Sequence, residues 1–163
     1  MKKISVELIK KLREATGAPV IRVKKVLEET MGDLPADATH QALQAGEKKA
    51  FEILQKEGFE KAAKREGRLT GAGKVFSYVH HTGKVVSVVE LFSETDFVSR
   101  NELFETLGRD IALQVASMGE KGLLKQEFIK DPAKKIEDLV KEVIAKTGEN
   151  VRVGRVFRVE LGK

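Results

Sequence analysis

The sequence contains no cysteine and no long run of apolar residues. Without cysteine, neither a disulfide framework nor thiolate chemistry is available. No stretch approaches the ~18 uncharged apolar residues that would indicate a membrane-spanning helix. The N-terminus is basic but reaches the charged Glu7 before any apolar run develops, so it lacks the pattern of a signal peptide. These absences predict a soluble cytoplasmic protein that does not bind a membrane.

Motifs of the common enzyme classes are missing as well. The glycines from Gly67 to Gly73 neither end in Gly-Lys-Ser/Thr nor follow a predicted strand, so they do not form a phosphate-binding loop. No serine or cysteine nucleophile has a supporting histidine and acid. His80 and His81 are neighbours on a predicted strand, so their side chains point to opposite faces and cannot simply bind one metal together. We expect no catalytic residues, no metal site, no cofactor and no enzyme activity.

The surface is highly charged but mixed in sign. Hydrophobic residues make up 41% and charged residues 34% of the 163 residues, with 30 Lys+Arg against 25 Asp+Glu and a net charge of +5. This mild basic excess fits an acidic protein partner or weak RNA contact. The basic stretch 56–74 contains a single aromatic residue, Phe59, and so lacks a stacking platform for single-stranded nucleic acid. We therefore expect no specific nucleic-acid partner.

Residues 1–57 predict a module of three short helices. The first follows the N-cap candidate Ser5 and stops at Gly17. The second begins at Pro19, which suits the first position of a helix. A third is expected just before Gly58, so that three apolar stripes can meet in a small core.

Two segments interrupt the regular patterns. Residues 34–46 contain Pro35 near their start and no clear amphipathic stripe, so we predict a surface-loop insertion there. Residues 58–74 mix Lys and Arg with glycine, which predicts a basic linker whose first half can be helical.

Residues 75–163 predict a small α+β core with an antiparallel sheet and helices. Two runs of β-branched and aromatic residues flank residues 81–84 and indicate a hairpin. Helices are predicted from Asn101 to Met118 and from Asp131 to Gly148. The last strand alternates, and we expect one of its faces to hold Val151, Val153, Phe157, Val159 and Leu161.

The segment Glu94–Asn101 lies where the hairpin ends and the long helix begins. Such junctions project side chains outward from a rigid base. Phe97 and Val98 are apolar within this otherwise polar stretch. By local rules alone, Phe97 is expected to be a buried hydrophobic staple for the following helix.

Four segments resemble the elongation factor Ts family in the order found there. The run 90–100 (ELFSETDFVSR) closely resembles the second family signature, whose hallmark is Thr-Asp-Phe-Val. Residues 12–18, together with 24–28, resemble the first signature. Residues 62–68 and 144–151 resemble further family segments. Together these matches are spread over most of the chain, from residue 12 to residue 151.

The resemblance implies a ubiquitin-associated-like (UBA-like) three-helix module, a linker and a dimerisation-type α+β core. Only a short stretch separates Met118 from Asp131, so the chain resembles the compact members with a single core subdomain. In the family, the tip of the core enters beside the magnesium and phosphates of the nucleotide on the GTPase elongation factor Tu (EF-Tu). The implied tip residues are Thr95, Asp96, Phe97 and Val98. The implied EF-Tu-docking residues of the N-terminal module are Leu12, Thr16, Gly17, Ala18, Lys24 and Lys25.

The resemblance therefore implies a guanine-nucleotide exchange factor for EF-Tu that acts in translation elongation. Such a factor binds EF-Tu with GDP and without nucleotide, perturbs the magnesium and phosphate site, and promotes GDP release so that GTP can bind. Phe97 should then be exposed in the free protein. A single core with an exposed sheet would also favour a homodimer.

Two other functions remain open at this point. A small RNA- or ribosome-binding protein would depend on the basic residues Lys61, Lys64, Arg65 and Arg68, with a steep salt dependence. A UBA-like adaptor would bind an unrelated partner through residues 1–57 alone.

Overall fold

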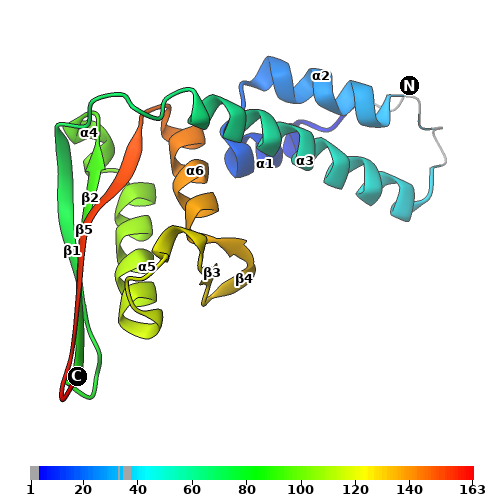
Figure 1. Cartoon of the computed structure of the whole chain (residues 1–163). Coiled ribbons are helices and arrows are strands. Elements are labelled where there is room, and N and C mark those ends of the chain that lie inside the picture. The colour runs from blue at the N-terminus through cyan, green and yellow to red at the C-terminus, as the bar shows by residue number, and fades with distance from the viewer. Residues whose placement is uncertain (1–3, 33, 35–37) are drawn as a thin grey trace. The chain divides into compact units, whose positions relative to one another are not determined.

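The computed structural model describes residues 4–32, 34 and 38–163 (Figure 1). The chain forms two compact units, Met1–Lys64 and Arg65–Lys163, and the division falls inside the predicted linker. No helix in the described part of the chain is both long and apolar enough to cross a membrane.

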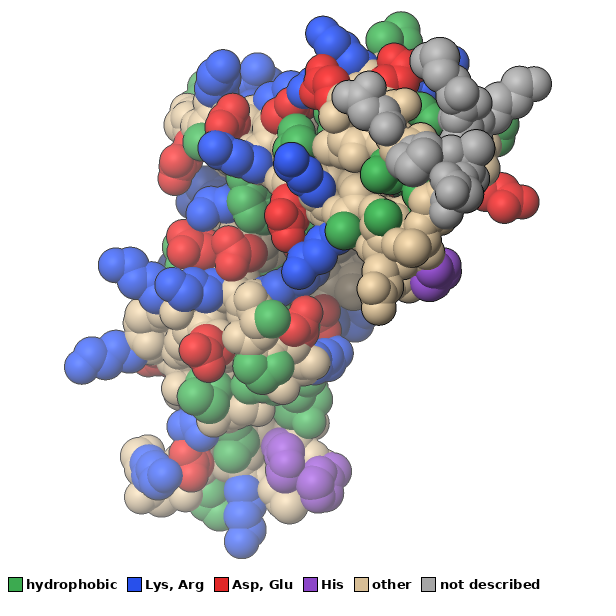
Figure 2. Space-filling view, turned by 90° about the vertical axis from the view of Figure 1, so that its right-hand side faces the viewer, with side chains coloured by type: hydrophobic (Ala, Val, Ile, Leu, Met, Phe, Trp, Pro, Cys, Tyr) green, Lys and Arg blue, Asp and Glu red, His purple; other side chains and the backbone are tan. Residues whose placement is uncertain are grey.

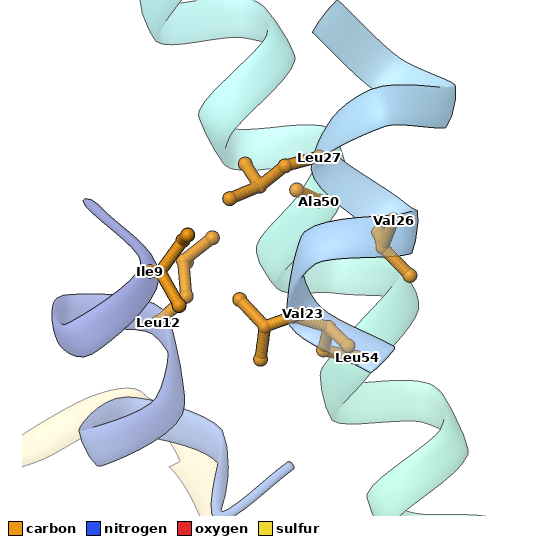
Figure 3. Close-up of a cluster of buried hydrophobic side chains, with 7 residues drawn as sticks. All are labelled: Ile9, Leu12, Val23, Val26, Leu27, Ala50 and Leu54. Carbon is orange, nitrogen blue, oxygen red and sulfur yellow. The ribbon is translucent and has the colours of Figure 1, made fainter. Parts of the chain in front are cut away.

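Unit 1 is built from three helices, α1 (Val6–Thr16), α2 (Val20–Met31) and α3 (His40–Ala63). Helix α1 begins as predicted, because the Ser5 hydroxyl accepts a hydrogen bond from the Leu8 N–H at 3.1 Å. All three helices contribute apolar side chains to one core (Figure 3), which consists of Ile9, Leu12, Val23, Val26, Leu27, Ala50 and Leu54. The module thus buries its own apolar stripes.

Helix α3 is longer than predicted. It has 24 residues, begins at His40 and passes through Gly58. The loop prediction for residues 34–46 is therefore wrong for residues 40–46, and residues 35–37 lie outside the described residues. Thr39 caps the helix by accepting the Ala42 N–H at 3.3 Å. The hydrophobic periodicity of α3 is weak in the sequence because three of its four buried residues, Gly46, Ala50 and Ala62, are small, and Leu54 is the exception.

An ion pair joins α2 to α3 in unit 1. Arg22 Nε donates to both carboxylate oxygens of Glu57 at 3.1 and 3.0 Å, and Arg22 Nη2 donates to one of them at 2.5 Å. Both side chains are only 30% exposed. The hydrogen bonds from this guanidinium lower the pKa of the Glu57 carboxyl below its usual range. The pair therefore keeps Glu57 ionised at a lower pH than an unpaired glutamate.

Unit 2 contains a three-stranded antiparallel sheet in the order β1-β2-β5 and a two-stranded ribbon β3-β4. The mixed arrangement confirms the predicted α+β class. Helices α5 and α6 lie on the same side of the sheet (Figure 1). The elements are β1 (Ala72–Val79), β2 (Val85–Ser93), α4 (Asp96–Ser99), α5 (Glu102–Met118), η1 (Leu123–Lys125), β3 (Glu127–Phe128), β4 (Asp131–Lys135), α6 (Ile136–Thr147) and β5 (Val151–Glu160).

The second core helix begins later than predicted. Residues Asp131–Lys135 form β4 and pair with β3, so α6 starts at Ile136. The helix start is set by Asp138, whose side chain accepts the Lys135 N–H at 3.0 Å. Pro132 is compatible with this short two-stranded ribbon because proline is tolerated in edge strands.

The last strand changes faces in its middle, so the prediction of one continuous apolar face is wrong. A register shift lies between the pairs Val89↔Val156 and Leu91↔Val153, where β5 has one more residue than β2. Before the shift, Val151 is buried on the helix side. After it, the Arg158 side chain is turned to that side and donates from Nε to the Ala116 carbonyl at 3.0 Å.

Helix α5 lies so close to β1 that there is no room for a Cβ atom at position 108 unless the Phe76 ring moves. A Cβ atom on Gly108 would lie 2.3 Å from two atoms of the Phe76 ring. We expect Gly108→Ala to lower the unfolding free energy of unit 2 by about 1–2 kcal/mol, because overpacking exceeds the gain in helix propensity. Calorimetry of the full chain tests this, with Gly71→Ala as control, since a Cβ there meets open space. An unchanged melting temperature for Gly108→Ala would contradict the packing argument.

The Arg22–Glu57 pair predicts a pH dependence for unit 1. A carboxyl whose pKa is lowered by folding stabilises the native state above its unfolded pKa of about 4.3, and this contribution disappears as the pH falls through the folded pKa. Replacing Arg22 by Gln should therefore destabilise unit 1 at neutral pH, with a difference that shrinks in acid. Thermal unfolding followed by the methyl NMR signals of Val23 and Leu54 measures it. Lys10→Gln, which removes an exposed pair with Glu14, should show almost no difference at either pH.

Candidate functional site

The Thr-Asp-Phe-Val segment forms a single helical turn, α4, between β2 and α5 (Figure 1). The turn is closed by hydrogen bonds from the Ser99 N–H to the Thr95 carbonyl at 3.3 Å and from the Arg100 N–H to the Asp96 carbonyl at 3.2 Å. Asn101 then starts α5, because its side chain accepts the Leu103 N–H at 2.8 Å. We call residues 95–98 the tip.

The tip exposes its aromatic residue. Phe97 is 88% exposed, so the local prediction of a buried staple is wrong and the exposure expected from the family resemblance is confirmed. Val98 is 8% exposed and takes the anchoring position instead, because neighbouring residues on one helical turn point in different directions. Thr95 and Asp96 are exposed. The tip thus presents Asp96 and Phe97 to solvent above a buried anchor.

Two buried serines hold the backbone of the tip from below. The Ser93 hydroxyl donates to the Thr95 carbonyl at 2.9 Å, and the Ser99 hydroxyl donates to the Asp96 carbonyl at 2.9 Å. Both serines are almost fully buried. These bonds give a second partner to two carbonyl groups that already accept a backbone N–H within the turn, and they therefore reinforce a very short helix.

The turn between α6 and β5 supports the tip from the side. Glu149 accepts the Thr95 N–H at 3.0 Å with one carboxylate oxygen and the Thr95 hydroxyl at 2.8 Å with the other. Next to it, the Asn150 N–H donates to the Glu94 carboxylate at 2.6 Å, and the Asn150 side chain donates to the Arg68 carbonyl at 2.9 Å. The sequence analysis did not single out Glu149 or Asn150, although both fall in the matching segment 144–151.

The tip has the chemistry of a binding surface. It offers one carboxylate, Asp96, and one apolar ring, Phe97. Among the residues that the structure describes, no group of three or more acidic or histidine side chains could hold a metal ion. His80 and His81 lie beyond the end of β1 with ring centres 4.1 Å apart, so the expectation that their side chains point to opposite faces is wrong. The Thr82 hydroxyl lies 2.8 Å from Nδ1 of His80. The two histidines are therefore residues of the turn between β1 and β2.

The predicted docking residues of unit 1 fall into two groups. Leu12 and Thr16 are 2% and 7% exposed and offer a partner almost no surface. Thr16 shapes the turn after α1 by donating to the Leu12 carbonyl at 2.6 Å and accepting the Ala18 N–H at 3.3 Å. Gly17 ends the helix with a φ of 71°, a conformation that favours glycine. By contrast, Lys24 and Lys25 are exposed.

The sequence analysis missed two apolar residues beside these lysines. Val20 is 41% and Ile21 is 83% exposed at the start of α2. Ile21 and Lys25 are four residues apart and therefore share one face of the helix. The signal was present in the sequence, because Ile21 does not fit the stripe of Val23 and Leu27 that faces the core. We refer to Ala18, Val20, Ile21, Lys24 and Lys25 as the module surface.

A further apolar surface covers the side of the sheet opposite to α5 and α6. Val79 pairs with Val86, which also pairs with Val159, while Val88 pairs with Phe157. Phe157 and Val159 are 54% and 67% exposed. We call this surface the open sheet face; it consists of Val75, Val79, Val86, Val88, Phe157 and Val159.

Two arginines at the margin of the open sheet face have partners within the chain. Arg155 donates from Nε to both oxygens of Glu90 at 3.0 Å, and the hydrogen bonds lower the pKa of the Glu90 carboxyl. The Arg152 guanidinium lies 4.3 Å from the centre of the Phe92 ring, a cation–π distance. On the face of the molecule shown in Figure 2, acidic and basic side chains are likewise mixed rather than separated.

Comparison with known proteins assigns the chain to a family. A family model described as Elongation factor TS matches residues 94–163, which include the tip. Elongation factor Ts of Leptospira biflexa serovar Patoc is 39% identical, with 98% of each chain covered. The proteins of the same name from Thermotoga maritima and Thermosipho melanesiensis are each 35% identical, with 98% of this chain and 97% and 100% of the relatives covered.

The alignments also show that this chain is compact. The alignment with the Leptospira protein spans 207 positions, whereas this chain has 163 residues. The relative therefore contains residues that have no counterpart here. Identity above one third over nearly the full length of both chains is far beyond a shared motif. The chain belongs to the elongation factor Ts family.

Proposed function

We propose that the chain is a guanine-nucleotide exchange factor for elongation factor Tu in translation elongation and acts in the cytoplasm. It binds EF-Tu·GDP, perturbs the site of magnesium and phosphate, and promotes GDP release so that GTP can bind. The observation that carries the proposal is the 88% exposure of Phe97, beside Asp96, on a firmly held turn of a chain from this family.

The proposed mechanism needs no covalent step, so the protein is not an enzyme. GDP and Mg²⁺ are held by many oriented donors and a strong divalent charge, and their spontaneous release is therefore slow. A wedge that binds the opened, empty pocket better than the closed one lowers the affinity for nucleotide. By linkage, the nucleotide lowers the affinity for the wedge by the same factor.

The four tip residues divide the work. Phe97 is the wedge, because a large apolar ring in water gains most by entering a protein pocket. Asp96 places a negative charge next to the magnesium and phosphates and so weakens their binding. Val98 anchors the turn in the core, and Thr95 ties it to Glu149. Only Asp96 and Phe97 would then enter the pocket of EF-Tu.

The module surface is proposed to supply affinity. Its exposed Ile21 and Val20 suit an apolar patch on the partner, and Lys24 and Lys25 suit acidic side chains around that patch. Leu12, Thr16 and Gly17 contribute indirectly, because they form the core and the turn on which this surface is built.

Phe97→Ala tests the function. The variant should keep its unfolding free energy within about 0.5 kcal/mol, because an exposed ring makes few contacts in the free protein. It should slow the release of fluorescent GDP from EF-Tu in stopped-flow assays by about 10-fold at a given concentration of the chain. Leu161→Ala is the matched control, since Leu161 is 75% exposed and lies just beyond the end of β5.

The opposite pattern would reject the wedge. A destabilised Phe97→Ala variant whose folded fraction releases GDP at the normal rate would show a structural role. A wild-type chain that leaves GDP release unchanged would favour the RNA-binding or adaptor interpretation instead.

We also propose a homodimer formed by two open sheet faces. The face has apolar side chains on all three strands, and Glu90 and Arg155 at its margin are paired with each other, so a twofold contact need not leave these two charges without a partner.

Sedimentation equilibrium should give about twice the 18.1 kDa of one chain. Phe157→Asp should return it to one chain, whereas Leu124→Asp, on the exposed part of η1, should not. A monomeric wild-type chain at ~100 µM would contradict this proposal.

A further inference from the structure

We infer that Glu149 is the residue that aims the tip. This inference rests on the proposed function, because aiming matters only if the tip enters a partner. Glu149 binds a single residue twice, through the N–H and the hydroxyl of Thr95 at 3.0 and 2.8 Å. Two bonds from two donors to one carboxylate fix direction as well as distance.

Thr95 is the point at which the direction of α4 is set. Its backbone is extended, with φ −130° and ψ 161°, and the helical turn begins at the next residue. Its N–H is held by Glu149, and its carbonyl accepts from the Ser93 hydroxyl and the Ser99 N–H. Ser93 belongs to β2 and Ser99 to α4, so Glu149 is, among the residues that the structure describes, the partner of Thr95 from outside these two elements.

The backbone on both sides of Glu149 is held in place by hydrogen bonds. Helix α6 ends at Gly148, whose φ of 81° turns the chain, and the Glu149 N–H donates to the Thr147 hydroxyl at 3.4 Å. Asn150 is 4% exposed and is bonded to both Glu94 and Arg68. β5 then begins at Val151, which pairs with Ser93. The carboxylate is therefore carried by a fixed piece of backbone.

The tip benefits from such a restraint because its exposed ring makes little packing contact of its own. A helical turn of four residues is unstable by itself, and Phe97 at 88% exposure has little packing to define its direction. A wedge that moves freely loses more conformational entropy when it enters a pocket than one that is already aimed. Glu149 should therefore affect how fast EF-Tu opens.

The bonds to Glu149 are solvent-exposed, so water can replace them when they are removed. Their loss should cost little stability, in contrast to the buried serine bonds on the other side of the tip. This difference separates a positioning role from a structural role.

The experiment compares Glu149→Ala, Glu149→Gln, Thr95→Val and the Glu149→Ala/Thr95→Val double variant. Glu120→Ala is the matched control, because it removes one exposed carboxylate of the same unit from the loop after α5. Stopped-flow GDP release from EF-Tu gives the maximal rate and the half-saturating concentration of each variant. Backbone NMR relaxation of the free proteins reports the mobility of Phe97.

Glu149→Ala should lower the maximal release rate by about 10-fold, with the half-saturating concentration changed less than about 2-fold. Glu149→Gln should retain an intermediate rate, since its amide can still bond Thr95. The double variant should be no slower than Glu149→Ala, because both changes break the same link. Phe97 should become more mobile in Glu149→Ala, while the melting temperature stays close to that of Glu120→Ala.

Three outcomes would overturn the inference. The first is a normal maximal rate for Glu149→Ala, and the second is a change confined to the half-saturating concentration. The third is a drop in melting temperature large enough to unfold the variant under assay conditions, since unfolding would then explain the lost activity. A wild-type chain without any effect on GDP release would instead reject the proposed function. In that case the mobility of Phe97 in Glu149→Ala still decides whether Glu149 restrains the tip.

Discussion

The pairing of β2 with β5 is the constraint on which the rest of unit 2 depends. These strands run antiparallel, and their last pair is Ser93 with Val151. Continuing that register past the strand ends places Glu94 beside Asn150 and Thr95 beside Glu149, which are the pairs that are hydrogen-bonded. A ladder of backbone bonds thus brings together two turns that are 54 residues apart in sequence. A slip of one residue would separate every one of these partners.

The two faces of the sheet differ because α5 and α6 cover one of them, while the other keeps exposed side chains such as Phe157. Helix α5 lies so close to β1 that Gly108 is needed where the Phe76 ring touches it, and Ser87 donates to the Ala112 carbonyl at 2.6 Å. This tight layer makes the base from which α4 projects. The bulge in β5 then turns Phe157 and Val159 to the opposite side. One extra residue in β5 therefore adds the two β5 side chains to the open sheet face.

Unit 1 differs from unit 2 in that it folds around a small core of a few side chains. Its helices approach closely where α3 carries Gly46 and Ala50, and Arg22 and Glu57 tie α2 to α3 at the margin. Small residues at a helix contact allow close packing but leave a weak hydrophobic pattern in the sequence. The start of α3 was missed for this reason, while α1, whose buried Ile9 and Leu12 are large, was found correctly.

The sequence by itself determined the α+β class, the start of α1 at Ser5, the start of α5 at Asn101 and the position of the tip. Each of these depends on residues within a few positions of one another, through caps, periodicity or a family motif. The exposure of Phe97 was expected from the family motif but not from local rules. The tertiary structure alone decided that Val98 is buried, that β5 changes faces, and that Glu149 meets Thr95. The physical reason is that burial and strand register are set by segments far apart in the chain, which no local pattern encodes.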